Sequence, residues 1–496
     1  MGKKKLKSKK EDNELYNHLE KCIGMMRGKI SKGDTKKYLL PLIFYKRISD
    51  VYDEEKEIAT EKYADTPELI DSPLIHRFIV PEGTHWNDIR NKTEDLGSAI
   101  VNAFMKIENA NIDDLAGIFS NFDNTKWTDK QTFSDDLLKS IIEHISQIPL
   151  KNKDCSNDVI GQVYEYLMKH YADIAKTKAG EFYTPRQVIN LMVRVLNPKL
   201  GEDIYDPACG TAGMLIEAFH VVGDSKATRG HLFGQESNPT THSLGKINLF
   251  LHGAEEFEIL SGDTFQSPRF LDTNGRLRQF DIVLANPPFS DDDWGIDKWP
   301  KDKYGRCIFG TPSENCGDYA WLQHMICSMK PHGRMAVVMP QGVLFKEKAI
   351  RKKLVESHKV ETIVQLPLKL FYATGLSPCI LFLKNDKTDD KIRFVDATDI
   401  YTKAVSRNVL TEEDVVQIID LITGPEDIEP LSHTADIEEI KNNDWELTVS
   451  HYAVKPFVDT TPPMKDVLVS VKNLDEEMRN LESKIEALEK ECGIYD

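Results

Sequence analysis

The sequence predicts an α/β fold in which a seven-stranded, mainly parallel sheet follows a helical domain and precedes a long C-terminal helix. From about residue 155, short apolar runs alternate with helical patterns, as is typical of parallel α/β units. Before that point apolar residues recur at helical spacing, and near the C-terminus they form a heptad pattern. We therefore predict a helical domain at residues 1–150, a sheet domain at 151–400 and a C-terminal extension at 401–496.

The composition is that of an ordinary globular protein, with 29% charged and 40% hydrophobic residues in a chain of 496. No apolar run reaches about 18 residues, so we expect no membrane span. The basic start, MGKKKLKSKK, is followed by acids rather than by the apolar centre of a signal peptide, so we expect a cytoplasmic location. The eight cysteines form no C-x-x-C pair, which argues against a zinc site and against a disulfide framework.

The net charge of −17 bears on nucleic-acid binding. A long grip on a phosphate backbone depends on clustered Lys and Arg, so this chain alone is not expected to provide one. Any nucleic-acid partner would be held by local patches or by another subunit.

The first domain, from residue 11 to about 150, has helical patterns throughout. Leu15, Leu19, Ile23 and Met26 share one face of a first helix. The segment KKYLLPLIFYKRISDVYDEE predicts a second, apolar helix that is interrupted at Pro41. No catalytic constellation is visible here, so we interpret the domain as a packing domain.

The sheet domain contains seven candidate strands. They are DIYD from 203, HLFGQ from 231, FEILS from 257, FDIVLA from 280, RMAVVMP from 334, ETIVQL from 361 and CILFLK from 379. Helical segments fit between most of them, for instance 186–196, 213–222, 240–252 and 317–330. Ligands of open α/β sheets bind outside the carboxyl ends of the strands, so the site is expected there.

The C-terminal extension ends in a heptad seam with charged flanks. Its apolar positions alternate by four and three residues: Val467, Val471, Leu474, Met478, Leu481, Ile485 and Leu488. The seam predicts a helix that either pairs with another chain or folds back on its own domain, and we favour a partner.

Three of the predicted strands end in residues suited to a nucleoside ligand. The first leads into DPACGTAGML, where Asp206 precedes a small-residue loop through Gly210, Thr211, Ala212 and Gly213 that opens a helix. The second ends at Glu236, 23 residues past Gly213, where such folds place an acid on ribose hydroxyls; a solvated glutamate is an equal alternative. The third ends at Asp263, which could accept a hydrogen bond from an adenine amino group, although a turn residue is the commoner role.

The fourth strand ends in DIVLANPPFSDDDW, residues 281–294. Pro287 and Pro288 remove two backbone donors and hold Asn286 outside helical geometry. The Asn286 amide and the Pro287 carbonyl could then accept both hydrogens of an exocyclic amine. An adenine amino group is a poor nucleophile because its lone pair is delocalised, and two acceptors would localise that pair for attack on a methyl sulfonium. Phe289 offers a face for an extruded base.

In these residues the chain resembles the DNA methyltransferases that methylate amino groups with S-adenosyl-L-methionine, whose hallmark is an N-P-P-aromatic turn. The resemblance implies a Rossmann-like methyltransferase sheet, and a catalytic turn of Asn286, Pro287, Pro288 and Phe289. An asparagine in the first position, rather than the serine usual in cytosine-N4 enzymes, favours adenine N6.

The segment from residue 161, which contains EFYTPR, is similar to the modification subunits of type I restriction-modification systems. The resemblance extends over residues 14 to about 400 and is most specific from 180 to 289; residues 317–345 also match the family's order of segments. It implies further cofactor contacts near the methionine moiety by Glu181, Phe182, Tyr183, Thr184, Pro185 and Arg186. No residue transfers cleanly to the second face of the base: Phe371 or Tyr372 could serve, but a core position is the expected role for either.

The resemblance also implies partners. They are double-stranded DNA, a specificity subunit that reads the target and binds two copies of this chain, and a restriction subunit with nuclease and translocase activity. An acidic chain without an obvious target-recognition domain agrees with the reading of the DNA target by a separate subunit.

Three other functions stay open at this point. An N-P-P-aromatic turn also serves methylation of cytosine N4 and of protein glutamine, and a scaffold without turnover could hold a specificity subunit on DNA. A nicotinamide oxidoreductase is disfavoured, because the loop lacks the G-x-G-x-x-G spacing. Methyl transfer from a sulfonium needs no metal, so none is predicted.

Overall fold

The computed structural model describes residues 17–31, 34–122, 124–148, 150–153, 184–223, 231–291, 294–314, 316–371, 377–404, 407–455 and 464–491. The chain divides into two compact units, Met1–Ala453 and Val454–Asp496, and each is described by itself. Glu181, Phe182, Tyr183 and Tyr372 lie outside the described residues.

The beginning of the first unit is helical, as predicted. After a helix at residues 17–26 it contains α2 (Lys36–Lys62), η2 (Pro67–Leu69), α3 (Trp86–Arg90), α4 (Leu96–Ala110), α5 (Ile112–Leu115), α6 (Thr125–Thr128) and α7 (Asp135–Ser146). These helices enclose an aromatic core in which Phe104 and Phe119 stack with ring centroids 4.5 Å apart. We call this region the helical domain.

Helix α2 continues through Pro41, so the predicted interruption was wrong. An internal proline costs a helix about 3 kcal/mol, because it removes one hydrogen bond and crowds the preceding turn. Here its neighbours Leu40, Leu42 and Ile43 are at most 1% exposed. Burying each such side chain stabilises the fold by about 2 kcal/mol, so their packing outweighs the proline.

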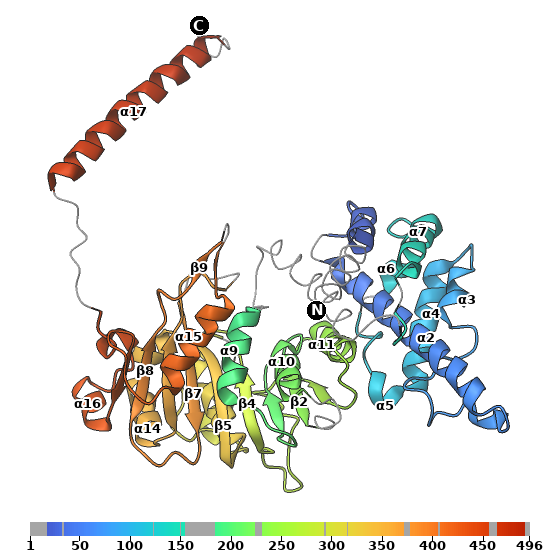
Figure 1. The fold of residues 1–496 in the computed structure, drawn as a ribbon, viewed down its shortest axis with the longest axis horizontal. Coiled ribbons are helices and arrows are strands. Elements are labelled where there is room, and N and C mark those ends of the chain that lie inside the picture. The colour runs from blue at the N-terminus through green and yellow to red at the C-terminus, as the bar shows by residue number, and fades with distance from the viewer. Residues whose placement is uncertain are drawn as a thin grey trace, which may run out of the picture. The chain divides into compact units, whose positions relative to one another are not determined.

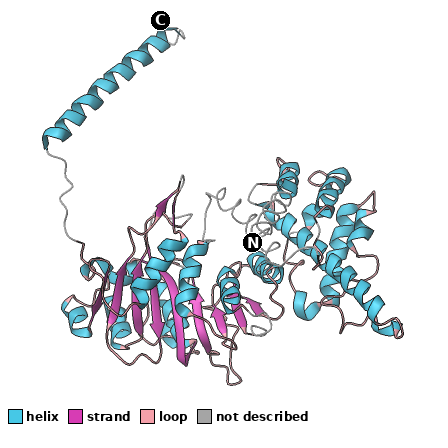
Figure 2. Ribbon diagram, viewed as in Figure 1, coloured by secondary structure: helices cyan, strands magenta, loops and turns pink. Residues whose placement is uncertain are grey.

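The rest of the first unit is built around a nine-stranded sheet. Figure 2 shows its strands together with the helices. It contains the seven predicted strands, β1 (Ile204–Asp206), β2 (Leu232–Glu236), β3 (Glu258–Ser261), β4 (Phe280–Ala285), β5 (Met329–Pro340), β6 (Val360–Gln365) and β7 (Pro378–Lys384). Two further strands, β8 (Ile392–Asp396) and β11 (Ser432–Ala435), extend it at the β6 side. The sheet thus continues past residue 400, and the first unit ends at Ala453, because β11 pairs with β8.

The strand order is β11-β8-β6-β7-β5-β4-β1-β2-β3. Strands β1 to β6 and β8 run parallel, while β7 is antiparallel to β5 and β6. From β1 the chain builds outward to β2 and β3 and then returns to place β4 on the other side of β1. In open α/β sheets ligands bind at such a reversal, so we expect the site at the carboxyl ends of β1 and β4. A separate small hairpin joins β9 (Thr402–Lys403) to β10 (Asn408–Val409).

Helices cover both faces of the sheet. One face packs against α9 (Arg186–Leu196), α10 (Gly213–Val222) and α15 (Glu412–Thr423), and Figure 1 shows α9 beside α15. The other packs against α12 (Asp318–Cys327), α13 (Gly342–Phe345), α14 (Lys348–Glu356) and the short segments η3 (Ile296–Lys301), α16 (Ile437–Asn442) and η4 (Val449–His451). Helix α11 (Pro239–Leu251) contributes Leu244, Ile247 and Leu251 to the core of the helical domain.

The second unit contains one long helix, α17 (Met464–Glu491), which confirms the helix predicted from the heptad pattern. Its apolar seam is open to solvent, with Leu474, Met478, Leu481, Ile485 and Leu488 between 53% and 62% exposed. In the part of the chain that the structure describes, no helix is long and apolar enough to cross a membrane.

Candidate active site at the carboxyl ends of β1 and β4

Strand β1 leads into a loop at residues 206–213, which we call the cofactor loop. Gly210 and Ala212 have positive φ angles of 54° and 62°, and α10 begins at Gly213. A Cβ atom on Gly210 would meet nothing within 4 Å, so this side of the loop is open to a ligand. The loop is anchored to β2, since Cys209 N donates to Gln235 O at 3.0 Å.

Glu236, at the end of β2, lies against the cofactor loop. One carboxylate oxygen accepts from Gly210 N at 3.0 Å, and the other accepts from Asn238 N at 2.8 Å. The carboxylate is therefore held at the loop rather than free in solvent, which was the alternative left open by the sequence.

Asp206 is 2% exposed and accepts from Ala208 N at 3.0 Å. Burial raises the pKa of this carboxyl group to about 8, and the nearby charge of Glu236 adds to the effect. Burial thus favours the protonated form of the acid at which the loop begins.

This protonation predicts a pH dependence of stability. Between the ordinary pKa of 3.8 and about 8, the folded chain retains a proton that the unfolded chain has lost. The free energy of unfolding should therefore fall as pH rises through this window. Because one pKa unit corresponds to about 1.4 kcal/mol, Asp206→Asn should reduce that fall by a few kcal/mol. Urea denaturation at pH 5 and pH 8 measures the free energy of unfolding. An equal change in this free energy between the two pH values for wild type and variant would contradict the prediction.

Asp263 forms a turn after β3. Its Oδ1 atom accepts from Phe265 N at 2.7 Å and from Gln266 N at 2.9 Å, which is the turn role that the sequence left as the alternative. The turn is joined to the cofactor loop, because Thr264 Oγ1 donates to Pro207 O at 2.6 Å. Asp263 therefore holds a turn that is joined to the cofactor loop.

Strand β4 leads into the turn Asn286–Phe289, which we call the catalytic turn. Asn286 Nδ2 donates to Thr184 Oγ1 at 2.8 Å, although the two residues are 102 positions apart. Asn286 Oδ1 is buried and has no hydrogen-bond partner within the described residues. Burying a carbonyl oxygen without a donor is costly, so this atom is a candidate acceptor for a ligand.

Asp318 supports the exit of the catalytic turn and was missed by the sequence analysis. Ser290 has a positive φ of 52°, and its N donates to Asp318 Oδ1 at 2.8 Å. Cys316 Sγ donates to Asp318 Oδ2 at 3.0 Å, and burial raises the pKa of the Asp318 carboxyl. The segment 317–345 was noted in the sequence, but an acid in the first turn of a helix is too common to signal this contact.

The other predicted residues lie either at the start of α9 or in the core. Thr184 is buried, Pro185 is the N-cap of α9, and Arg186 Nε lies 3.8 Å from Glu217 Oε2 of α10. Phe371 is 3% exposed within the core on the α9 face. Its position agrees with the core role expected for it.

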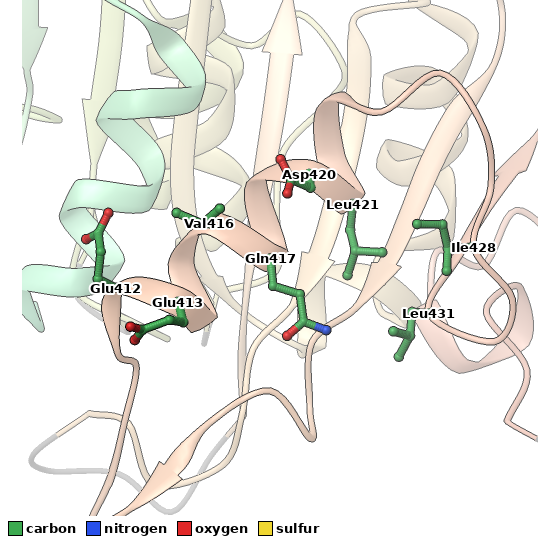
Figure 3. Close-up of a pocket in the computed structure, with 8 residues that line it drawn as sticks. All are labelled: Glu412, Glu413, Val416, Gln417, Asp420, Leu421, Ile428 and Leu431. Carbon is green, nitrogen blue, oxygen red and sulfur yellow. The ribbon is translucent and has the colours of Figure 1, made fainter.

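An open hollow of about 480 Å³ lies elsewhere, along α15 (Figure 3). Glu412 and Glu413 lie at one end, and Leu421, Ile428 and Leu431 at the other. None of the predicted site residues lines it. Its acidic end would repel a phosphate backbone, so we assign DNA no contact there.

Comparison with known proteins decides the family. The N-6 DNA Methylase family model matches residues 155–459, and the HsdM N-terminal domain model matches residues 15–145. The chain belongs to the N-6 DNA methylase family. Among its relatives, the type I restriction enzyme MjaVII methylase subunit of Methanocaldococcus jannaschii is 32% identical, over 90% of this chain and 79% of the relative. The MpnII methylase subunit of Mycoplasma pneumoniae is 26% identical, over 96% of each chain.

Solved structures agree with this assignment. A type I methyltransferase subunit from Streptococcus thermophilus matches with a TM-score of 0.76 and 25% identity, over 90% of this chain and 100% of that one. A modification subunit of a type I restriction enzyme from Vibrio vulnificus, at 22% identity and a TM-score of 0.65, shares the fold over 86% of this chain and 93% of its own.

These matches confirm the resemblance drawn from the sequence. This N-6 DNA methylase is a modification subunit of the type I restriction-modification class, and its reaction is methyl transfer to adenine N6 in DNA. The readings as a cytosine-N4 or protein-glutamine methylase, or as a scaffold, are not favoured. Membership of the family also implies the use of S-adenosylmethionine.

Proposed function

We propose that the catalytic turn binds the amino group of the target adenine through two acceptors, Asn286 Oδ1 and the Pro287 carbonyl. The observation that carries this proposal is the buried Oδ1 atom of Asn286, which lacks a donor among the described residues. The amide cannot rotate freely, because its Nδ2 atom is held by Thr184 Oγ1 at 2.8 Å. Its oxygen is therefore presented in a defined direction before substrate arrives.

The two acceptors would change the electronic state of the amine. Hydrogen bonds from both N6 hydrogens draw the amino group from planar toward tetrahedral geometry, so that the lone pair becomes available. The catalytic turn supplies position and electrostatics and forms no covalent bond to the base. Phe289, partly buried against the α9 face, offers a ring on which the extruded base can stack.

The cofactor loop fits S-adenosylmethionine. Gly210 leaves room for close approach, and Glu236 and Asp206 place carboxyl groups at the ends of β2 and β1. When bound, this cofactor would supply a methyl group on a sulfonium: as the N–C bond forms the C–S bond breaks, the sulfur leaves as a neutral thioether, and the methylated amine then releases one N6 proton to solvent. We assign cofactor binding to Asp206, Gly210, Thr211, Ala212, Gly213, Glu236 and Asp263, and to the EFYTPR strip at residues 181–186.

Mass spectrometry of nucleosides tests the reaction. The chain, assembled with its specificity subunit, is incubated with DNA and S-adenosylmethionine that carries a trideuterated methyl group. We expect labelled N6-methyladenine in the digested DNA. Label found only in N4-methylcytosine, or only in glutamine of an added protein, would overturn the proposed target.

The chain is proposed to act in a multi-subunit enzyme. Its net charge of −17 is unsuited to holding DNA alone, so a specificity subunit would read the target and provide much of the basic surface. We propose two copies of this chain for each specificity subunit, with a restriction subunit joining the full enzyme. Because the substrate is DNA, we place its action in the cytoplasm.

Helix α17 is proposed as the contact with a partner, either a helical part of the specificity subunit or a second copy of this chain. Its exposed apolar seam would be buried in a coiled coil. Deleting residues 464–496 should abolish stable assembly, because half-exposed Leu, Ile and Met side chains are the surface that association would bury. Size-exclusion chromatography of the mixed subunits measures this, and an unchanged elution volume would contradict it.

A further inference from the structure

We infer that α11 couples the packing of the helical domain to the conformation of the cofactor loop, with Gly245 and Asn248 as positioning residues for S-adenosylmethionine binding. This inference rests on the proposed function, because it requires the cofactor to bind at that loop.

One face of α11 supports the cofactor loop from behind. Asn248 is 4% exposed, and its Nδ2 atom donates to Thr211 O at 2.7 Å. A Cβ atom on Gly245 would lie 2.9 Å from Gly210 O, so any larger residue would press directly on the loop backbone. One turn earlier, His242 Nε2 lies 2.9 Å from Ile259 O of β3. Residues 242, 245 and 248 therefore hold the helix against the loop and the sheet.

A second face of α11 receives the helical domain. Ser243, which is fully buried, donates from Oγ to Gly117 O at 2.6 Å and accepts from Asn121 Nδ2 at 3.1 Å. Lys246 Nζ donates to Ala116 O at 3.2 Å. Farther along, the Phe250 ring stacks on Phe44, with centroids 5.7 Å apart. Polar and aromatic contacts thus fasten the helical domain to this face.

The loop-side and domain-side contacts alternate along one helix, α11. Residues 242, 245 and 248 share one helical face, and residues 243, 246 and 250 share another. A helix moves as a unit, so a shift that follows loosening of the domain contacts also moves Gly245 and Asn248. The cofactor loop depends on support from α11, because Gly210 and Ala212 both hold positive φ angles.

The consequence is that residues of the helical domain should influence cofactor affinity without touching the cofactor. Coupling between two sites typically changes affinity by about 5-fold to 150-fold. We expect about a fivefold increase in the dissociation constant when the domain contacts are weakened. On the loop side, Asn248→Ala and Gly245→Ala should raise it by tenfold or more, as ordinary coupling allows.

Isothermal titration of the full chain with S-adenosylmethionine tests the inference. The domain-side variant is Asn121→Ala combined with Ser243→Ala, whose side chains hydrogen-bond to each other, to Gly117 and to Pro239. The matched control is Ser146→Ala, which removes the hydroxyl that accepts a hydrogen bond from Trp86 Nε1 within the helical domain. We expect weaker binding at unchanged stoichiometry for the domain-side variant, and wild-type affinity for the control.

The outcomes are distinguishable. A merely structural defect would lower the binding stoichiometry and leave the dissociation constant of the remaining sites unchanged, which would overturn the inference. Wild-type affinity in the domain-side variant would also overturn it. No binding by the wild-type chain, alone or with its partners, would instead overturn the proposed function. In methylation assays the Michaelis constant for the cofactor should rise, while kcat at saturating cofactor should return to the wild-type value.

Discussion

Replacing Asn286 with alanine is expected to reduce methyl transfer to adenine about a thousandfold while cofactor binding stays nearly intact. The substitution removes the side-chain oxygen that would accept an N6 hydrogen and leaves the cofactor loop unaltered. Loss of one preorganised hydrogen-bonding group in an active site commonly costs about 10²–10³ in kcat. Transfer of tritiated methyl groups to target DNA measures the rate, and isothermal titration measures cofactor affinity.

The matched control for this experiment is Asn274→Ala, an exposed asparagine in the connection before β4. It should transfer methyl groups at the wild-type rate. Thr184→Val removes the hydroxyl that orients the Asn286 amide, so its loss should be smaller than that of Asn286→Ala. If Asn286→Ala transferred methyl groups as fast as Asn274→Ala, the catalytic turn would have no role in the reaction.

Replacing Asp318 with alanine is expected to lower kcat about a hundredfold, although this residue is not placed against the base. Its carboxylate accepts from Ser290 N and so holds the residue that follows the catalytic turn in a left-handed conformation. Displacing a reacting group by about 1 Å can cost roughly 10²-fold in rate. Steady-state kinetics measures kcat, and the fluorescence of 2-aminopurine at the target position reports whether the base is extruded.

Asp318→Asn separates positioning from charge. Its amide oxygen can still accept from Ser290 N, so we expect it to recover most of the activity that Asp318→Ala loses. Cofactor affinity should be unchanged in both variants. If Asp318→Ala lowered only the number of active sites, with kcat for each site unaffected, the residue would stabilise the fold without positioning the turn.

The arrangement of the site follows from the reversal in strand order. The cofactor loop follows β1 and the catalytic turn follows β4, and these strands are neighbours in the sheet. The carboxyl ends of parallel neighbours meet at one edge, so the two loops lie at the same edge of the sheet.

Features with a local cause were predictable from the sequence. The structure contains all seven predicted strands, and α9 and α10 have the predicted bounds of 186–196 and 213–222. Apolar periodicity and a glycine-containing loop act within about ten residues, so a single sequence reveals them. Strand β11, SHTA, has little apolar character, and it becomes a strand only because β8 offers it an edge. The sheet therefore continues past the boundary predicted at residue 400.

The sequence by itself determined the fold class, the helix with a heptad seam and the N-P-P-F turn for which we propose a catalytic role, because each is encoded in neighbouring residues. Only the tertiary structure decided that Thr184 orients Asn286, that Asp318 supports Ser290, and that α11 lies between the helical domain and the cofactor loop. These contacts join residues that are at least 28 positions apart in the chain. Such pairs carry no periodic signal, since their proximity comes from the packing of whole strands and helices.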